Sequence, residues 1–233
     1  KYTKSRKEWE WNESTPHEIF NIKRVTVGAF ADPQHVNIDN DGHSLSKNFN
    51  LLQPGIFSWD WIRRNGPNIA TIDLNATNEW VNFARQNDLR VRNGNPLVIH
   101  YGLPDWLKNG QFTRDQMIQI MTEHIKTVVG RYKGKVSEWV VANEAVWYSQ
   151  GQSGYEPANP FYKSIGPDFL DIAFQAARDA DPSATLIYND WGNEQPGSKA
   201  DVVFNQVKKL KDKGLIDAVG MQYHIGSPPK LPQ

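Results

Sequence analysis

The sequence of 233 residues contains no cysteine. This absence excludes disulfide bonds, thiolate zinc sites and a cysteine nucleophile, and it leaves the redox compartment undetermined. The chain also lacks an excess of charge of either sign, because 26 Lys and Arg residues balance 26 Asp and Glu residues. Such a balance creates no broad electrostatic field, so neither nucleic acid nor an anionic membrane surface is expected as a partner.

No stretch of the chain remains apolar for the roughly 20 residues that a membrane-spanning helix requires. The sequence opens at Lys1, without an initiating Met and without an apolar signal segment. We therefore expect a processed or shortened polypeptide. A mature secreted protein, extracellular or periplasmic, whose signal peptide is not part of these residues, is compatible with this start.

Aromatic residues are plentiful, with 9 Trp, 8 Tyr and 10 Phe in a chain that is 39% hydrophobic. Flat aromatic faces serve a packed core or the wall of a sugar-binding cleft, and composition does not separate these two uses. The length suits one sizeable core, so we expect residues 1–233 to form a single domain. Residues 1–20 are expected to form a leading helix or an extended arm.

Short β-rich runs alternate with segments of helical periodicity along the chain. We expect strands within residues 24–30, 48–53, 89–100, 136–144, 184–188 and 216–221, and helices within 77–86, 113–131, 168–179 and 199–213. Alternation with helical crossovers indicates an α/β protein with a parallel sheet. The Asx-rich segment 31–46 lacks the spacing and terminal Glu of an EF-hand and is interpreted as a solvated turn. The span 147–160 is interpreted as a long functional loop.

The most informative stretch is 136–148. It begins with an apolar run that indicates a buried strand, and this run ends in Asn143 and Glu144. The carboxyl ends of parallel strands carry the chemistry in a (β/α)8 TIM barrel, and polar residues also end other predicted strands here. They are His100, Asn189, Asp190, Gln222 and His224. A rim of this kind favours the barrel over a doubly wound sheet, which has one switch point and a glycine-rich phosphate loop.

Several of these residues also have a second interpretation. Glu144 can simply cap the next element or pair with a surface cation. Trp59, in an aromatic loop after the second strand, can be a lid on the core or a wall of a ligand cleft. Asp190 and His224 could also suggest a metal-dependent hydrolase, but their spacing in the sequence is not that of metal ligands. We expect neither a metal nor a cofactor.

Four segments in chain order, 96–106, 139–145, 188–197 and 216–224, resemble glycoside hydrolase family 10, the retaining endo-β-1,4-xylanases. The resemblance implies a TIM barrel that cleaves internal linkages of a xylan-like plant polysaccharide or oligosaccharide. It implies that Glu144 is the general acid/base, that Asn143 binds the sugar 2-hydroxyl and that His224 orients the nucleophile. His100, Asn189 and Gln222 would line the catalytic centre.

The chain departs from the family pattern in the substrate cleft. Asn95 stands where the family has a histidine, and Ile99 where it has a tryptophan. The family's Glu, Asn and Lys contacts after the second strand are replaced by the segment 55–59. We count Asn95 and Trp59 as substrate-binding candidates in this more apolar cleft. The departures keep a second hypothesis open, a catalytically impaired carbohydrate-binding or scaffold protein.

The family's nucleophile is a Glu at the end of strand seven, and this chain stops at Gln233, soon after the predicted sixth strand. We therefore expect the chain to supply about the first six β/α units of the barrel. An incomplete parallel barrel leaves two unpaired edges, which soluble proteins avoid. Strands seven and eight and the nucleophile are expected from outside these residues, possible sources being a second polypeptide segment or a part of the protein not represented here.

Overall fold

The structure is a computed structural model, which describes residues 16–18, 25–32, 34–149 and 152–223. His224 and nearly all of the expected leading segment 1–20 lie outside the described residues. Six parallel strands form the inner layer of the described part of the chain. They are β1 (Gly28–Ala31), β2 (Leu51–Pro54), β3 (Arg90–Val91), β4 (Glu138–Asn143), β7 (Thr185–Asp190) and β8 (Ala218–Met221).

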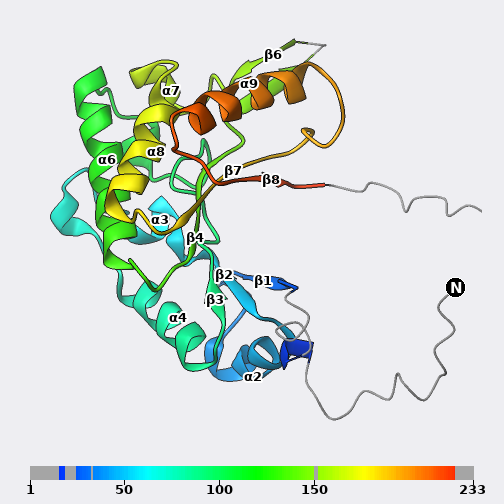
Figure 1. Cartoon of the computed structure of the whole chain (residues 1–233). Helices are drawn as coiled ribbons and strands as arrows, with labels where there is room; N and C mark the ends of the chain where they lie inside the picture. The colour runs from blue at the N-terminus through cyan, green and yellow to red at the C-terminus, as the bar shows by residue number, and fades with distance from the viewer. Residues whose placement is uncertain (1–15, 19–24, 33, 150–151, 224–233) are drawn as a thin grey trace, which may run out of the picture.

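The strands pair in the order β1-β2-β3 and β4-β7-β8, and two bridges, Arg92 to Glu138 and Val98 to Ala142, join the two groups. Chain order and spatial order therefore agree along one curved row of strands (Figure 1). The main helices of the outer layer are α2 (Ile38–Asn48), α4 (Asn75–Gln86), α6 (Arg114–Arg131), α8 (Phe169–Ala180) and α9 (Ser198–Asp212). This arrangement is that of a (β/α)8 TIM barrel, with six of its strands described, and it confirms the expected fold class.

Helix α6 shows how the sequence specifies this layer. Thr113 caps its start in a reciprocal pair with Gln116: each side chain accepts from the other residue's backbone N–H. Its buried side chains recur at helical spacing, from Met117 to Val129, and belong to the same core as the strand residues Trp139 and Val141. Burial of this stripe, at roughly 25 cal/mol per Å² of apolar surface, fixes the helix against the sheet.

Two segments differ from the sequence-based expectation. Residues 38–48 form helix α2 rather than a solvated turn, because the Asn37 side chain accepts the N–H groups of Asp39 and Asn40 and Leu45 reaches the core. The predicted loop after β4 contains an antiparallel hairpin, β5 (Val146–Ser149) and β6 (Gln152–Tyr155). The short helix α7 (Pro160–Ile165) follows it. None of the described helices has both the length and the apolar character that crossing a membrane requires.

Candidate active site

Glu144 directly follows the end of β4, where the backbone leaves the strand in an unusual conformation. Its φ is +51°, in the left-handed region that residues other than glycine rarely adopt, and its N–H donates to the carbonyl oxygen of Asn189 at 3.0 Å. Such a conformation persists only where its surroundings enforce it, and it occurs often at functional sites. The backbone of β7 therefore helps to hold Glu144 in this conformation at the strand end.

The carboxyl group of Glu144 is held by hydrogen bonds to one of its two oxygens. Oε1 accepts from Gln222 Nε2 at 2.7 Å, from Asn143 Nδ2 at 3.0 Å and from the Tyr101 hydroxyl at 3.3 Å. Among the described residues no donor contacts Oε2, and no Lys or Arg forms an ion pair with this carboxyl group. Pairing with a surface cation is therefore not the role of Glu144 in the described part of the chain.

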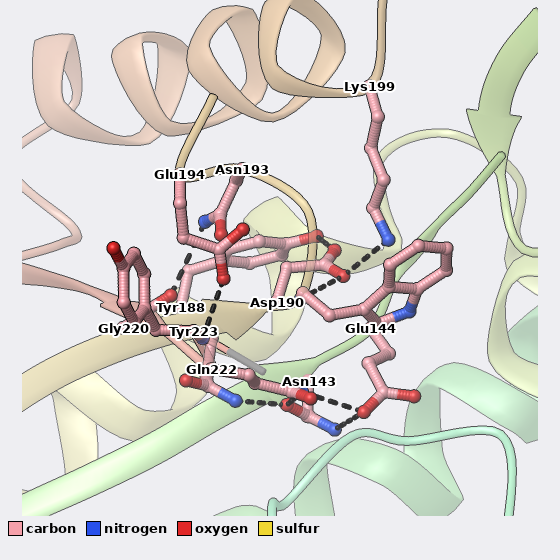
Figure 2. Close-up of polar contacts among 12 residues, drawn as sticks. Asn143, Glu144, Tyr188, Asp190, Asn193, Glu194, Lys199, Gly220, Gln222 and Tyr223 are labelled. Atoms are coloured by element: carbon pink, nitrogen blue, oxygen red, sulfur yellow. Dashed lines mark hydrogen bonds and ion pairs between the residues drawn. The ribbon is translucent and has the colours of Figure 1, made fainter. Parts of the chain in front are cut away.

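Asn143 connects the strand ends around Glu144 (Figure 2). The side chain is 4% exposed, and its Oδ1 accepts from Asn189 Nδ2 at 2.5 Å and from Gln222 Nε2 at 3.3 Å. Asn189 can lie there because its neighbour on β8 is Gly220: a Cβ at that position would come within 2.3 Å of Asn189 Oδ1. The site thus depends on one glycine that leaves room for an amide.

A buried charged cluster lies under the loop after β7. Lys199 Nζ is 2.8 Å from Asp190 Oδ1 and 3.3 Å from the centre of the Trp191 ring, and the Tyr188 hydroxyl donates to Asp190 Oδ2 at 2.7 Å. Burial raises the pKa of Asp190, although Lys199 and Tyr188 act in the opposite direction. A buried carboxylate of this kind needs its cation. The cluster therefore anchors Trp191, a residue that is 39% exposed.

Three hollows lie around these strand ends. One of about 360 Å³ is lined by Tyr101, Asn143, Glu144, Asn189 and Gln222, among others. A second, of about 780 Å³, shares Phe30 and Asn95 with it and extends past Trp61 and Trp106. A third, of about 390 Å³, is lined by Tyr148 and Trp191. The largest hollow lies away from Glu144, so we identify the site by its polar groups and not by volume.

The structure brings together most of the residues that the sequence singled out. Asn143, Glu144, Asn189 and Gln222 form one network, and Asn95 lines the hollow beside them with its Oδ1 buried and without a hydrogen bond among the described residues. His100 differs: it packs edge-on against Tyr101 with ring centres 4.9 Å apart, and it is not among the residues that line the hollow.

The prediction that Trp59 contacts substrate is wrong for this conformation. The side chain is fully buried, its Nε1 donates to the Leu97 carbonyl oxygen at 2.8 Å, and its ring stacks on His124 at 3.6 Å. The reason is the inward turn of the segment that carries it, formed by η2 (Gly55–Phe57) and α3 (Trp59–Ile62). The aromatic residue of this segment that does face a hollow is Trp61, which is 38% exposed.

Sequence reasoning missed Tyr101, Tyr148 and Trp191, although each lies close to a predicted strand end. Tyr101 directly follows His100 and Trp191 directly follows Asp190, so position was a usable signal. Burial raises the pKa of Tyr101 to about 12, and the neighbouring Glu144 carboxylate contributes to the shift. Its hydroxyl therefore stays protonated at neutral pH. The described residues contain no group of three or more His, Cys, Asp or Glu side chains that could hold a metal ion.

Comparisons with known proteins show the family of the chain. A sequence model described as glycosyl hydrolase family 10 matches residues 17–231. Endo-1,4-beta-xylanase B of Thermotoga neapolitana is 38% identical over 181 residues, which are 77% of this chain and 50% of that protein. Beta-1,4-xylanase of Dictyoglomus thermophilum is 38% identical over 219 residues, 91% of this chain and 59% of that protein.

The fold also matches solved structures. The crystal structure of xylanase 10B from Thermotoga petrophila RKU-1 in complex with xylobiose superposes with a TM-score of 0.82 at 31% identity, covering 92% of this chain and 65% of that one. The chain thus spans between half and two thirds of the length of these relatives. Because the family model covers nearly the whole sequence, the chain belongs to glycosyl hydrolase family 10.

Proposed function

We propose that the protein is a retaining endo-1,4-β-xylanase that cleaves internal linkages of a xylan-like polysaccharide, with Glu144 as its general acid/base. The observation that carries the proposal is the placement of the Glu144 carboxyl group: it lines a hollow at a strand's carboxyl end, is fixed through Oε1 and keeps Oε2 without a donor among the described residues. Barrel enzymes place their chemistry at this end of the sheet.

The proposed reaction uses the two oxygens of Glu144 differently. Oε2 protonates the glycosidic oxygen as the bond to the sugar breaks, and later takes a proton from the water that hydrolyses the glycosyl-enzyme. Retention requires a second carboxylate about 5 to 5.5 Å from the first. We place this nucleophile outside the 233 residues, with His224 orienting it, and assign the contacts to the sugar to Asn143, Asn189, Gln222 and Asn95.

Completion of the barrel is part of the proposal. The two terminal strands of the described row, β1 and β8, each pair with one neighbour. Both carry large exposed apolar side chains: Phe30 is 55%, Val219 40% and Met221 58% exposed. We propose that a further segment, from the same or a second polypeptide, pairs with these edges, covers these side chains and supplies the nucleophile, so that residues 1–233 form part of one catalytic domain.

The substrate assignment rests on the relatives and on the shape of the rim. Besides the hollow beside Glu144, two neighbouring hollows are lined by the partly exposed residues Trp61 and Trp191. Three hollows of this kind suit a substrate that consists of several sugar rings. Because a polysaccharide does not cross a membrane, we propose an extracellular site of action, or a periplasmic one if the substrate is a short oligosaccharide.

The test uses the complete natural polypeptide that contains these residues. Release of reducing ends from xylan, mannan and β-glucan is measured for the parent and for Glu144→Gln, which keeps the side chain's shape and removes its acid. We expect activity on xylan that the substitution lowers by about a hundredfold or more. Undiminished activity in the variant overturns the role of Glu144. Binding of xylo-oligosaccharides without turnover by the parent identifies the alternative, a carbohydrate-binding or scaffold protein.

A further inference from the structure

The phenol of Tyr101 contacts both residues at the end of β4. Its hydroxyl oxygen is 3.1 Å from Asn143 Nδ2, from which it accepts, and 3.3 Å from Glu144 Oε1, to which it donates. Asn143 Nδ2 is in turn 3.0 Å from the same Oε1. The three atoms form a nearly equilateral triangle, so one N–H of Asn143 can be shared between the two oxygens. The second N–H of that amide then remains for a sugar hydroxyl.

Tyr101 approaches the carboxyl group from a different side than the other donors. It follows β3 in the chain, whereas Gln222 follows β8, and the strand order β3, β4, β7, β8 puts these on opposite sides of β4. Asn143, the third donor, lies on β4 itself and is tied to Asn189 of β7. Among the described residues Tyr101 is therefore the one donor that reaches Glu144 from the β3 side.

We propose that Tyr101 is a positioning residue of the reaction: its hydroxyl balances the pull of Gln222 on Glu144 Oε1 and so aims Oε2 at the oxygen that leaves. This inference rests on the proposed function. Glu144 needs such support because a glutamate carboxyl turns freely about its side-chain bonds unless its neighbours fix it. The Tyr101 hydroxyl can donate this hydrogen bond at neutral pH, because its pKa is raised to about 12 and it stays protonated.

The Tyr101 hydroxyl can be removed without disturbing the core. The residue is 48% exposed, so it contributes less to the core than the buried aromatic residues do. Removing only the hydroxyl leaves the ring against His100 and leaves Gln222 and Asn143 as the remaining donors. The carboxyl group then shifts toward β8, and proton donation to the leaving oxygen becomes slower, while contacts to the sugar elsewhere remain.

The experiment compares Tyr101→Phe with the parent on two substrates in the complete polypeptide. Xylo-oligosaccharides have a poor leaving group that needs protonation, and an aryl β-xylobioside with a strongly acidic phenol needs almost none. We expect kcat/KM for the oligosaccharide to fall about tenfold and kcat/KM for the aryl substrate to change less than about twofold. Tyr162→Phe is the matched control, because its ring packs on Tyr155 and Phe169 and the same hydroxyl is removed.

A second measurement does not depend on turnover. The ionisation of Tyr101 is followed by ultraviolet absorbance, as the difference between parent and Tyr101→Phe, with and without Glu144→Gln. We expect the Tyr101 pKa to fall when Glu144 loses its charge, because that carboxylate helps to raise it. An unchanged pKa, an equal loss on both substrates or a gain in kcat/KM overturns the inference. Absence of turnover in the parent with the pKa shift present overturns the proposed function and leaves the Tyr101–Glu144 contact standing.

Discussion

Gln222 Nε2 lies 2.7 Å from Glu144 Oε1, although the two residues are 78 positions apart in the chain. The contact exists because β4 and β8 flank β7 in a parallel sheet, so that the residues following both strands emerge at the same rim. Each part of this hydrogen-bond network consequently depends on the register of the sheet. Small changes in the strands should therefore affect the site without unfolding the protein.

Gly220→Ala tests this dependence. The new Cβ meets the Asn189 side-chain oxygen at 2.3 Å, and the flexible amide yields by rotating away from Asn143. We expect kcat/KM on xylan to fall about ten- to a hundredfold while the melting temperature changes little, because misplacement by about 1 Å is enough to slow catalysis.

Gly130→Ala is the control for this substitution. Gly130 lies in helix α6, where the methyl group that alanine adds would meet no atom within 4 Å apart from its chain neighbours and the adjacent backbone of its own helix, so the variant should keep full activity. Its free energy of unfolding should rise by about 0.4–1 kcal/mol, since alanine loses less backbone entropy in a helix. Full activity in Gly220→Ala would show that Asn189 does not hold Asn143 in place.

The sequence allowed prediction of those features that local patterns record. The buried run before Asn143 and Glu144 indicated a strand end, and the spacing from Met117 to Val129 indicated α6. The sequence could not show which aromatic residue lies in the core and which faces a hollow. Trp59 is buried and Trp61 is exposed, yet they lie two positions apart in the same short segment. The contact between Tyr101 and Glu144 spans 43 positions and depends on pairing between the β3 and β4 segments, which no local pattern records.

His124 should make the protein sensitive to acid. Its ring is fully buried, neither nitrogen has a hydrogen-bond partner among the described residues, and burial with the charge of Arg63 lowers its pKa well below the ordinary value. Below about pH 6.5, His124 therefore binds a proton in the unfolded chain but not in the folded protein. Stability is full above this pH and falls by up to about 1.4 kcal/mol per pH unit below it.

His124→Phe removes this proton linkage and keeps a flat ring against Trp59. We expect urea unfolding of the variant at pH 7.5 and 5.5 to give a smaller difference in free energy than the parent shows, with no loss at pH 7.5. His43→Gln, at an exposed position of α2, should behave as the parent does. An unchanged acid slope in His124→Phe would mean that other groups cause it.

Lys199→Met leaves the Asp190 carboxyl group buried without its cation. We expect the free energy of unfolding to fall by about 3–5 kcal/mol, and the double variant with Asp190→Asn to regain a large part of the loss. The measurement is equilibrium urea unfolding at pH 7.5. Lys208→Met is the matched control on the same helix, where the partner Asp212 is exposed and little change is expected. Equal effects of the two Lys substitutions would refute the account of the cluster.

Azide rescue of Glu144→Ala tests whether Glu144 acts as both acid and base in a retaining reaction. An aryl β-xylobioside with an acidic phenol still forms the glycosyl-enzyme in this variant, but no base remains to activate water. Azide needs no base. We expect added azide to accelerate turnover and to give the β-xylobiosyl azide, identified by nuclear magnetic resonance. A turnover rate that does not change with added azide, or the α-xylobiosyl azide as product, would contradict the proposed role of Glu144.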